Sequence, residues 1–139
     1  MKTIIVDTCF WIALYNPQKH IDLIEIVESI SELIEDEEII IPFPSLYEFL
    51  NSKFSRKSDA INFRQLLSRP NYVKLDDNPY KLIALNNFFD LAINGHNDVS
   101  FVDEIIKEII LDKKIKVDFL VTFDEGLKNF ALSRGVKTL

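Results

Sequence analysis

The chain has 139 residues, of which 47% are hydrophobic and 27% charged, and its formal net charge at pH 7 is −6. This length and composition predict a single domain over residues 1–139, and the negative charge argues against binding nucleic acid by charge alone. No apolar run reaches the ~20 residues that cross a bilayer and no leader-like segment opens the chain, so we expect a cytoplasmic protein with no membrane segment.

The N-terminal part predicts a strand and two helices. Residues 3–6 are rich in β-branched side chains, which is typical of a short, fully buried strand, and this strand ends at Asp7. Residues 8–15 predict a buried helix that contains the only cysteine, Cys9. One cysteine excludes an intramolecular disulfide, and beside Phe10 and Trp11 it is expected to act as a small buried hydrophobic residue. Residues 20–35 predict an amphipathic helix with an acidic outer face.

The remainder alternates strands with helices. Strands are predicted at residues 38–41, 72–75, 117–121 and 136–139, and helices at residues 45–53, 57–68, 79–93, 100–111 and 126–132. Such alternation is typical of an α/β domain with a parallel sheet, here with extra helices between the second and fourth strands. Charge is segregated, because the charged residues in 22–38 are all acidic whereas those in 53–74 are all basic except Asp59.

Four acidic residues lie where such a fold would bring them together. Asp7 ends the first strand and Asp124 follows the penultimate one, while Glu48 and Asp103 are expected in the first turns of the helices over 45–53 and 100–111. The carboxyl ends of parallel strands, and the helices that begin there, share one edge of the sheet. The sequence therefore predicts an acidic site at that edge.

A purely structural interpretation is open for three of these acids. Ser45 with Glu48 and Ser100 with Asp103 fit the spacing of a capping box, as does Thr122 with Glu125, and acidic residues in a first helical turn interact favourably with the helix dipole. Asp124 can also be read as a turn residue. No comparable structural reason accounts for Asp7 after three aliphatic residues.

Four carboxylates at one place need positive charge, because their mutual repulsion would otherwise raise several pKa values. Mg²⁺ and Mn²⁺ are satisfied by carboxylate oxygens and water, and they keep positions open for a phosphate group. Zinc is not expected, since the chain has no cysteine cluster and only His20 and His96, of which His96 is predicted to lie in an exposed loop.

These motifs carry a resemblance to a known family. Ile5-Val6-Asp7-Thr8, Pro44-Ser45-x-x-Glu48, Ser100-Phe101-Val102-Asp103 and Val121-Thr122-Phe123-Asp124 resemble, in order and over essentially the whole chain, the PIN-domain ribonucleases. The similarity is greatest to the small VapC-like toxins of toxin–antitoxin pairs. The resemblance implies a three-layer α/β/α fold with a central, mostly parallel sheet.

The resemblance also implies a function and its residues. Asp7, Glu48, Asp103 and Asp124 would hold one or two Mg²⁺ or Mn²⁺ ions, with Thr8 and Thr122 orienting the carboxylates or contacting phosphate. The activity implied is hydrolysis of RNA phosphodiester bonds that leaves a 5′-phosphate and a 3′-hydroxyl. The partners implied are a second copy of the chain and a small protein antitoxin.

Some features depart from that pattern or leave it open. The position after Asp103 is often small in these toxins but is Glu104 here, the chain is more acidic than many of them, and Asp98 has no assigned role. Basic help for RNA would come from Lys53, Arg56, Lys57 and Arg64, which are equally explained as a solvated helix face. A haloacid-dehalogenase-type phosphatase or a receiver domain would need acids at other positions. The stronger alternative is a PIN fold that binds RNA or protein without cleaving.

Overall fold

The computed structural model describes residues 1–139 and is built on a five-stranded sheet in which all paired strands run parallel. The strands are β1 (Thr3–Val6), β2 (Glu38–Pro42), β3 (Tyr72–Leu75), β4 (Phe119–Val121) and β5 (Lys137–Thr138). Their order across the sheet is β3-β2-β1-β4-β5. The first strand of the chain is therefore the central strand of the sheet.

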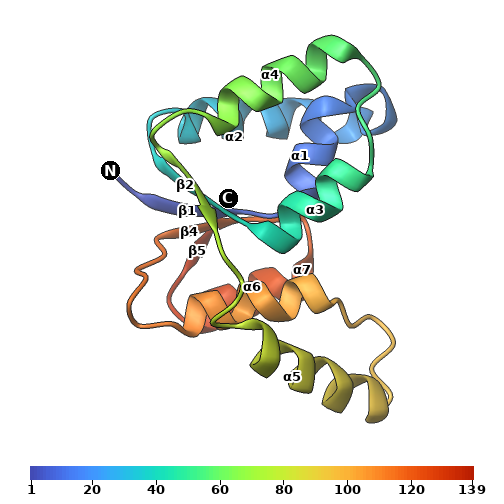
Figure 1. Ribbon diagram of the computed structural model, residues 1–139, viewed down its shortest axis with the longest axis vertical. Coiled ribbons are helices and arrows are strands. Elements are labelled where there is room, and N and C mark those ends of the chain that lie inside the picture. The colour runs from blue at the N-terminus through green and yellow to red at the C-terminus, as the bar shows by residue number, and fades with distance from the viewer.

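Helices cover both faces of this sheet, which gives three layers (Figure 1). One layer contains α1 (Thr8–Tyr15), α2 (Ile24–Ile34), α3 (Phe43–Asn51) and α4 (Lys57–Leu67), and the other contains α5 (Lys81–Ile93), α6 (Phe101–Leu111) and α7 (Glu125–Ser133). Right-handed crossovers explain this division, because connections that step from β1 toward β3 and connections that step back toward β5 place their helices on opposite faces. The α/β class and its parallel sheet are confirmed.

Alternating side chains of the central strands form the two cores. Ile4 and Val6 point into the core beneath α1 to α4, while Ile5 points into the core beneath α5 to α7. All three are at most 2% exposed, which is why this strand contains only apolar side chains after Thr3. The first core also holds a group of edge-to-face aromatic rings that includes Trp11, Phe49 and Phe63.

The chain adds β2 and β3 on one side of β1 and then β4 and β5 on the other, so the strand order reverses between β1 and β4. Val6 of β1 lies beside Val121 of β4, and the backbone N–H of Asp7 donates to the carbonyl oxygen of Val121 over 2.9 Å. Both strands thus end at the same level, and their next residues leave the sheet side by side. Ligand sites of open α/β sheets lie at such a switch point, outside the carboxyl ends of the strands.

Several boundaries differ from those predicted. The helix expected at 45–53 begins at Phe43, directly after β2, and the helix expected from 20 begins as a 3₁₀ turn at Ile21–Leu23 before α2. Pro79 lies in the turn before α5 rather than inside that helix. No helix is both long enough and apolar enough to span a bilayer.

Candidate acidic site

Asp7 is the most tightly held member of the predicted quartet. Its side chain is 6% exposed and caps α1, because Oδ1 accepts from the backbone N–H of Thr8 over 2.8 Å. Its other oxygen, Oδ2, accepts from the hydroxyl of Thr122 over 2.8 Å. Burial raises the pKa of this carboxyl above 3.8 and the neighbouring charge of Asp124 adds to the rise, against the opposing effect of these hydrogen bonds.

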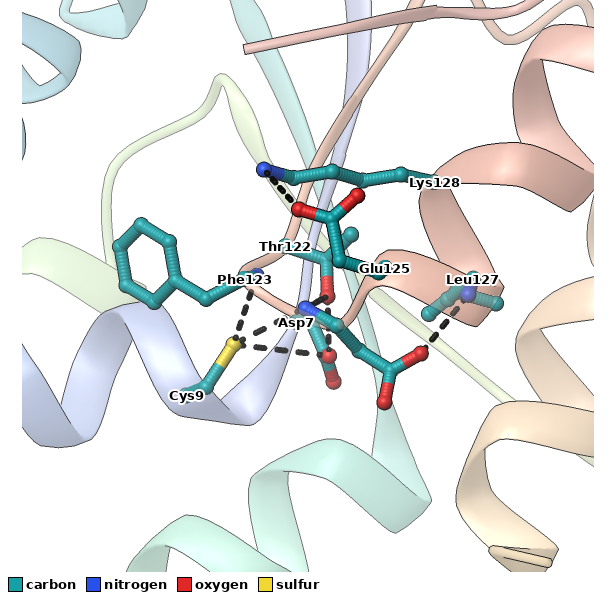
Figure 2. A network of polar contacts seen from close by, with 8 residues as sticks. Asp7, Cys9, Thr122, Phe123, Glu125, Leu127 and Lys128 are labelled. Carbon is teal, nitrogen blue, oxygen red and sulfur yellow. Dashed lines mark hydrogen bonds and ion pairs between the residues drawn. The ribbon is translucent and has the colours of Figure 1, made fainter. Parts of the chain in front are cut away.

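Thr122 and Cys9 complete the surroundings of Asp7 (Figure 2). The Thr122 hydroxyl is fully buried, donates to Asp7 and accepts from the backbone N–H of Asp124 over 3.2 Å. The thiol of Cys9 lies 3.6 Å from Asp7 Oδ2, and its sulfur accepts from the N–H of Phe123. Burial and the charge of Asp7 raise the pKa of this thiol to about 12, so it remains a protonated donor.

Cys9 was missed by the sequence reasoning, which treated it as a hydrophobic residue. It is only partly buried and contacts the candidate site. Its position two residues after Asp7, in the first turn of the helix that Asp7 caps, was the available signal.

Asp124 lies at the N-terminus of α7, where its Oδ1 accepts from the N–H of Leu127 over 2.7 Å. It is the cap of this helix, so the capping box expected between Thr122 and Glu125 does not form. A Cβ placed on Gly126 would come 3.3 Å from Asp124 Oδ1, so the glycine leaves the space that this carboxylate occupies. The Asp124 side chain is otherwise exposed to solvent.

Asp103 lies in the first turn of α6, as predicted, and Ser100 caps that helix by accepting from the Asp103 N–H over 3.2 Å. Burial raises the pKa of the Asp103 carboxyl from 3.8 to about 7, and the charges of Asp7, Asp124 and Glu48 add to this effect, while Lys107 opposes it. All three other quartet members therefore act on Asp103. The capping interpretation accounts for the Ser100 hydroxyl but not for this charge environment.

Glu48 differs from its prediction in detail. It lies in the second turn of α3 and is exposed, because the helix begins at Phe43. The expected capping box with Ser45 is wrong, since Ser45 lies inside the helix and its buried hydroxyl has no hydrogen-bond partner. Thr8 also differs, because its hydroxyl donates to the carbonyl oxygen of Ser45 over 3.2 Å and only its backbone N–H contacts Asp7.

The four acids thus come from four segments at the switch point of the sheet, and the charges of Asp7, Asp124 and Glu48 all raise the pKa of Asp103. No three Asp, Glu, His or Cys side chains are arranged as a set that could hold a metal ion as they stand. Asp7 is fixed by its three hydrogen bonds and Asp124 by the hydrogen bond that caps α7, whereas Glu48 is exposed and Asp103 is partly exposed. The oxygen-only donor set fits a hard divalent cation.

The two residues left open by the sequence lie on one side of this cluster. Glu104 faces inward, is 5% exposed and forms an ion pair with Lys107, whose Nζ lies 2.9 Å from Oε2. Asp98 is exposed in the loop between α5 and α6 together with His96, as expected for that histidine. Asp98, Asp103, Glu104 and Asp124 contribute to the lining of one cavity.

The basic residues proposed to help bind RNA are all exposed. Arg56, which directly precedes α4, pairs with Asp59 over 3.1 Å, and Arg64 lines a hollow between α3, α4 and β3. Nothing in their contacts separates an RNA-binding face from a solvated one.

Comparison with known proteins adds no assignment: no model of a protein family matches the chain, and no curated protein matches it.

Proposed function

We propose that the chain is a Mg²⁺- or Mn²⁺-dependent endoribonuclease that hydrolyses RNA phosphodiester bonds, and that it serves as the toxin of a toxin–antitoxin pair of the VapC-like, PIN-domain kind. The observation that carries the proposal is the charge environment of Asp103, whose pKa is raised to about 7 by burial and by Asp7, Asp124 and Glu48. A structural role for each acid separately gives no reason to gather four of them.

The chemistry follows from the donor set. Asp7, Glu48, Asp103 and Asp124 would hold the ion, and a bound Mg²⁺ or Mn²⁺ would acidify a coordinated water and offset negative charge on the phosphate in the transition state. Thr122 keeps Asp7 in a fixed orientation through its 2.8 Å hydrogen bond, and the N–H of Thr8 holds the opposite oxygen. Cys9 adds a weak donor to the same oxygen as Thr122. Because these contacts already fix the Asp7 carboxylate, it would not have to change its orientation when the cation binds.

The alternative is a non-catalytic domain of the same fold that binds RNA or protein. The two proposals differ in what Asp103 does. In a nuclease, Asp103→Asn removes a ligand of the ion and should lower Mn²⁺-dependent cleavage of a mixed RNA pool by ~100-fold or more. The exposed Asp90 of α5 provides the matched control, Asp90→Asn, which should cleave at the wild-type rate. Cleavage by the Asp103→Asn variant at the wild-type rate would contradict the nuclease proposal.

The proposed partners follow from the same resemblance. A second copy of the chain finds support in α5, whose exposed face carries Leu82 at 70%, Ile83 at 55% and Ile93 at 80% exposure. Exposed apolar side chains in this number are typical of an association surface. Light scattering should give the mass of a dimer, and a monomer at all concentrations would refute the proposed dimer.

A small antitoxin would cover the acidic cluster, and co-expression with the product of a neighbouring short reading frame should abolish cleavage.

A further inference from the structure

The cavity to which Asp98, Asp103, Glu104 and Asp124 contribute adjoins the acidic cluster. It has a volume of about 250 Å³ and lies between the loop that joins α5 to α6, the first turns of α6 and the N-terminus of α7. Asp103 and Asp124 belong to its wall, so the cavity and the proposed cation site share two side chains. Pockets for complete small-molecule ligands measure about 300–1,000 Å³, so this cavity suits one ring system rather than a whole nucleotide.

One lysine side chain, that of Lys107, lines this cavity. Lys107 is its only lysine or arginine, and its ammonium group is held by the buried Glu104 at 2.9 Å and by the ring of Phe130, whose centroid is 5.6 Å away. Glu104 therefore neither crowds the cluster nor faces solvent. It holds the ammonium group of Lys107, which lines the same cavity as Asp103.

The charge of the lining excludes a phosphate group as the occupant. Four carboxylates, those of Asp98, Asp103, Glu104 and Asp124, outnumber the single ammonium. Two of them would bind the cation and Glu104 is paired with Lys107, which leaves Asp98. Asp98 makes no side-chain hydrogen bond or ion pair within the chain, so its two oxygens are free acceptors at the rim of the cavity.

The remaining groups are those that read the edge of a base. Lysine is suited to the O6 and N7 acceptors of guanine, and a carboxylate accepts from amino and imino N–H groups. Leu91, Val99 and Leu127 supply an apolar wall for the face of a ring, and His96 is the one aromatic side chain in the lining that can stack on it. Guanine is the base that presents a carbonyl acceptor next to two N–H donors, so it matches one ammonium and one free carboxylate.

We propose that this cavity binds the base of the nucleotide next to the scissile phosphate and selects guanine, with Lys107 donating to O6 and Asp98 accepting from N1–H and the N2 amino group. The proposal deepens the ribonuclease function and rests on it, because only a ribonuclease has a scissile phosphate next to the bound base. The shared wall of Asp103 and Asp124 is what places the bound base next to the reacting phosphate.

A binding experiment tests the cavity without cleavage and without metal. Guanosine, inosine and uridine are titrated into the full chain in chelator, and backbone amide shifts are followed by NMR. Guanosine should shift the amides of residues 96–100 and 126–127 saturably. Inosine lacks the N2 amino group and should bind ~10-fold more weakly, since one lost hydrogen bond to a charged group is worth about 1.5 kcal/mol. Uridine should bind more weakly still.

Variants assign the contacts. Asp98→Asn, at an exposed position that is not expected to affect folding, should remove the difference between guanosine and inosine, whereas Lys113→Met, at an exposed lysine outside the cavity, should leave it unchanged. Lys107→Met should weaken both nucleosides, and its folding is checked from the same spectra because it leaves Glu104 unpaired.

The outcomes separate this proposal from the ribonuclease proposal. Guanosine shifts in the cavity without any Mn²⁺-dependent RNA cleavage would support the base site and contradict the nuclease. Cleavage mapped equally next to all four bases, or equal shifts with guanosine and uridine, would overturn the base site and leave the nuclease standing. If both proposals hold, cleavage sites should be enriched next to guanine by ~10-fold, and Asp98→Asn should reduce that enrichment to near one.

Discussion

Asp103→Asn should make the metal-free protein more stable at neutral and alkaline pH. The folded-state pKa of Asp103 is about 7 and its ordinary value is 3.8. The folded protein therefore binds this proton more tightly than the unfolded chain, and the stability this provides is complete below about pH 4 and is lost as pH rises through about 7. Above that pH the wild-type protein must hold an ionised Asp103 beside three other carboxylates.

The magnitude follows from the same pKa. Raising it from 3.8 to about 7 corresponds to about 4 kcal/mol, at about 1.4 kcal/mol for each pKa unit. The side chain of Asp103 is partly exposed, and solvent screens its repulsion, so we take about half of this value, ~2 kcal/mol. Asparagine keeps the shape and carries no charge. The variant should therefore gain ~2 kcal/mol of unfolding free energy at about pH 8 and only a few tenths at about pH 4.5.

Urea unfolding in chelator at those two pH values measures the effect, with Asp90→Asn as the surface control. Addition of Mn²⁺ should then stabilise the wild type more than the variant, because only the wild type retains the complete set of ligands. A variant that is no more stable than the wild type at about pH 8 would show that the four carboxylates do not repel one another as argued.

Two further predictions concern buried hydroxyl groups. Ser45→Ala should be neutral or should stabilise the protein by up to about 1 kcal/mol, because the Ser45 hydroxyl is buried without a partner and alanine is the better helix former. Urea unfolding measures this change. A loss of stability above about 1 kcal/mol would show that the hydroxyl has a partner. Thr122→Val should destabilise the protein by about 1–3 kcal/mol and weaken Mn²⁺ binding, measured by calorimetry, by ~10-fold or more, because Asp7 loses its 2.8 Å donor and its pKa rises further. Thr122→Ser keeps the hydroxyl and should retain most of the stability and of the Mn²⁺ affinity. A valine variant that binds Mn²⁺ as tightly as the wild type would show that Thr122 does not orient Asp7.

The sequence predicted the parts of the fold that depend on local pattern. The apolar run at residues 4–6, the strand at 72–75 and the amphipathic helices follow from side-chain periodicity, which is a local property. The position of Asp7 after a buried strand was informative for the same reason, because burial of the strand requires aliphatic residues and a carboxylate after it needs another explanation. The class of fold then followed from the alternation of elements.

The features that sequence did not predict depend on groups far apart in the chain. Ser45 and Glu48 have the spacing of a capping box, but β2 passes directly into α3 and the helix starts two residues earlier, which places the serine inside it. The capping box expected between Thr122 and Glu125 does not form, and the Thr122 hydroxyl donates to Asp7, 115 positions away, a contact with a carboxylate that the family resemblance implied but local spacing did not. The ion pair of Glu104 with Lys107 follows from helical spacing, whereas its burial against the acidic cluster does not.

The order of the strands has a consequence for how the molecule is made. Asp7, Glu48 and Asp103 leave the ribosome before β4 and α7, yet β4 pairs with the central strand β1 and α7 begins beside Asp124. Until that last pairing forms, one side of β1 has no neighbour and Asp7 lacks Thr122. A nascent chain therefore carries most of the acids but cannot assemble them, so synthesis itself delays whatever activity the cluster supports, and a local opening of the same C-terminal segment in the finished protein would switch that activity off again.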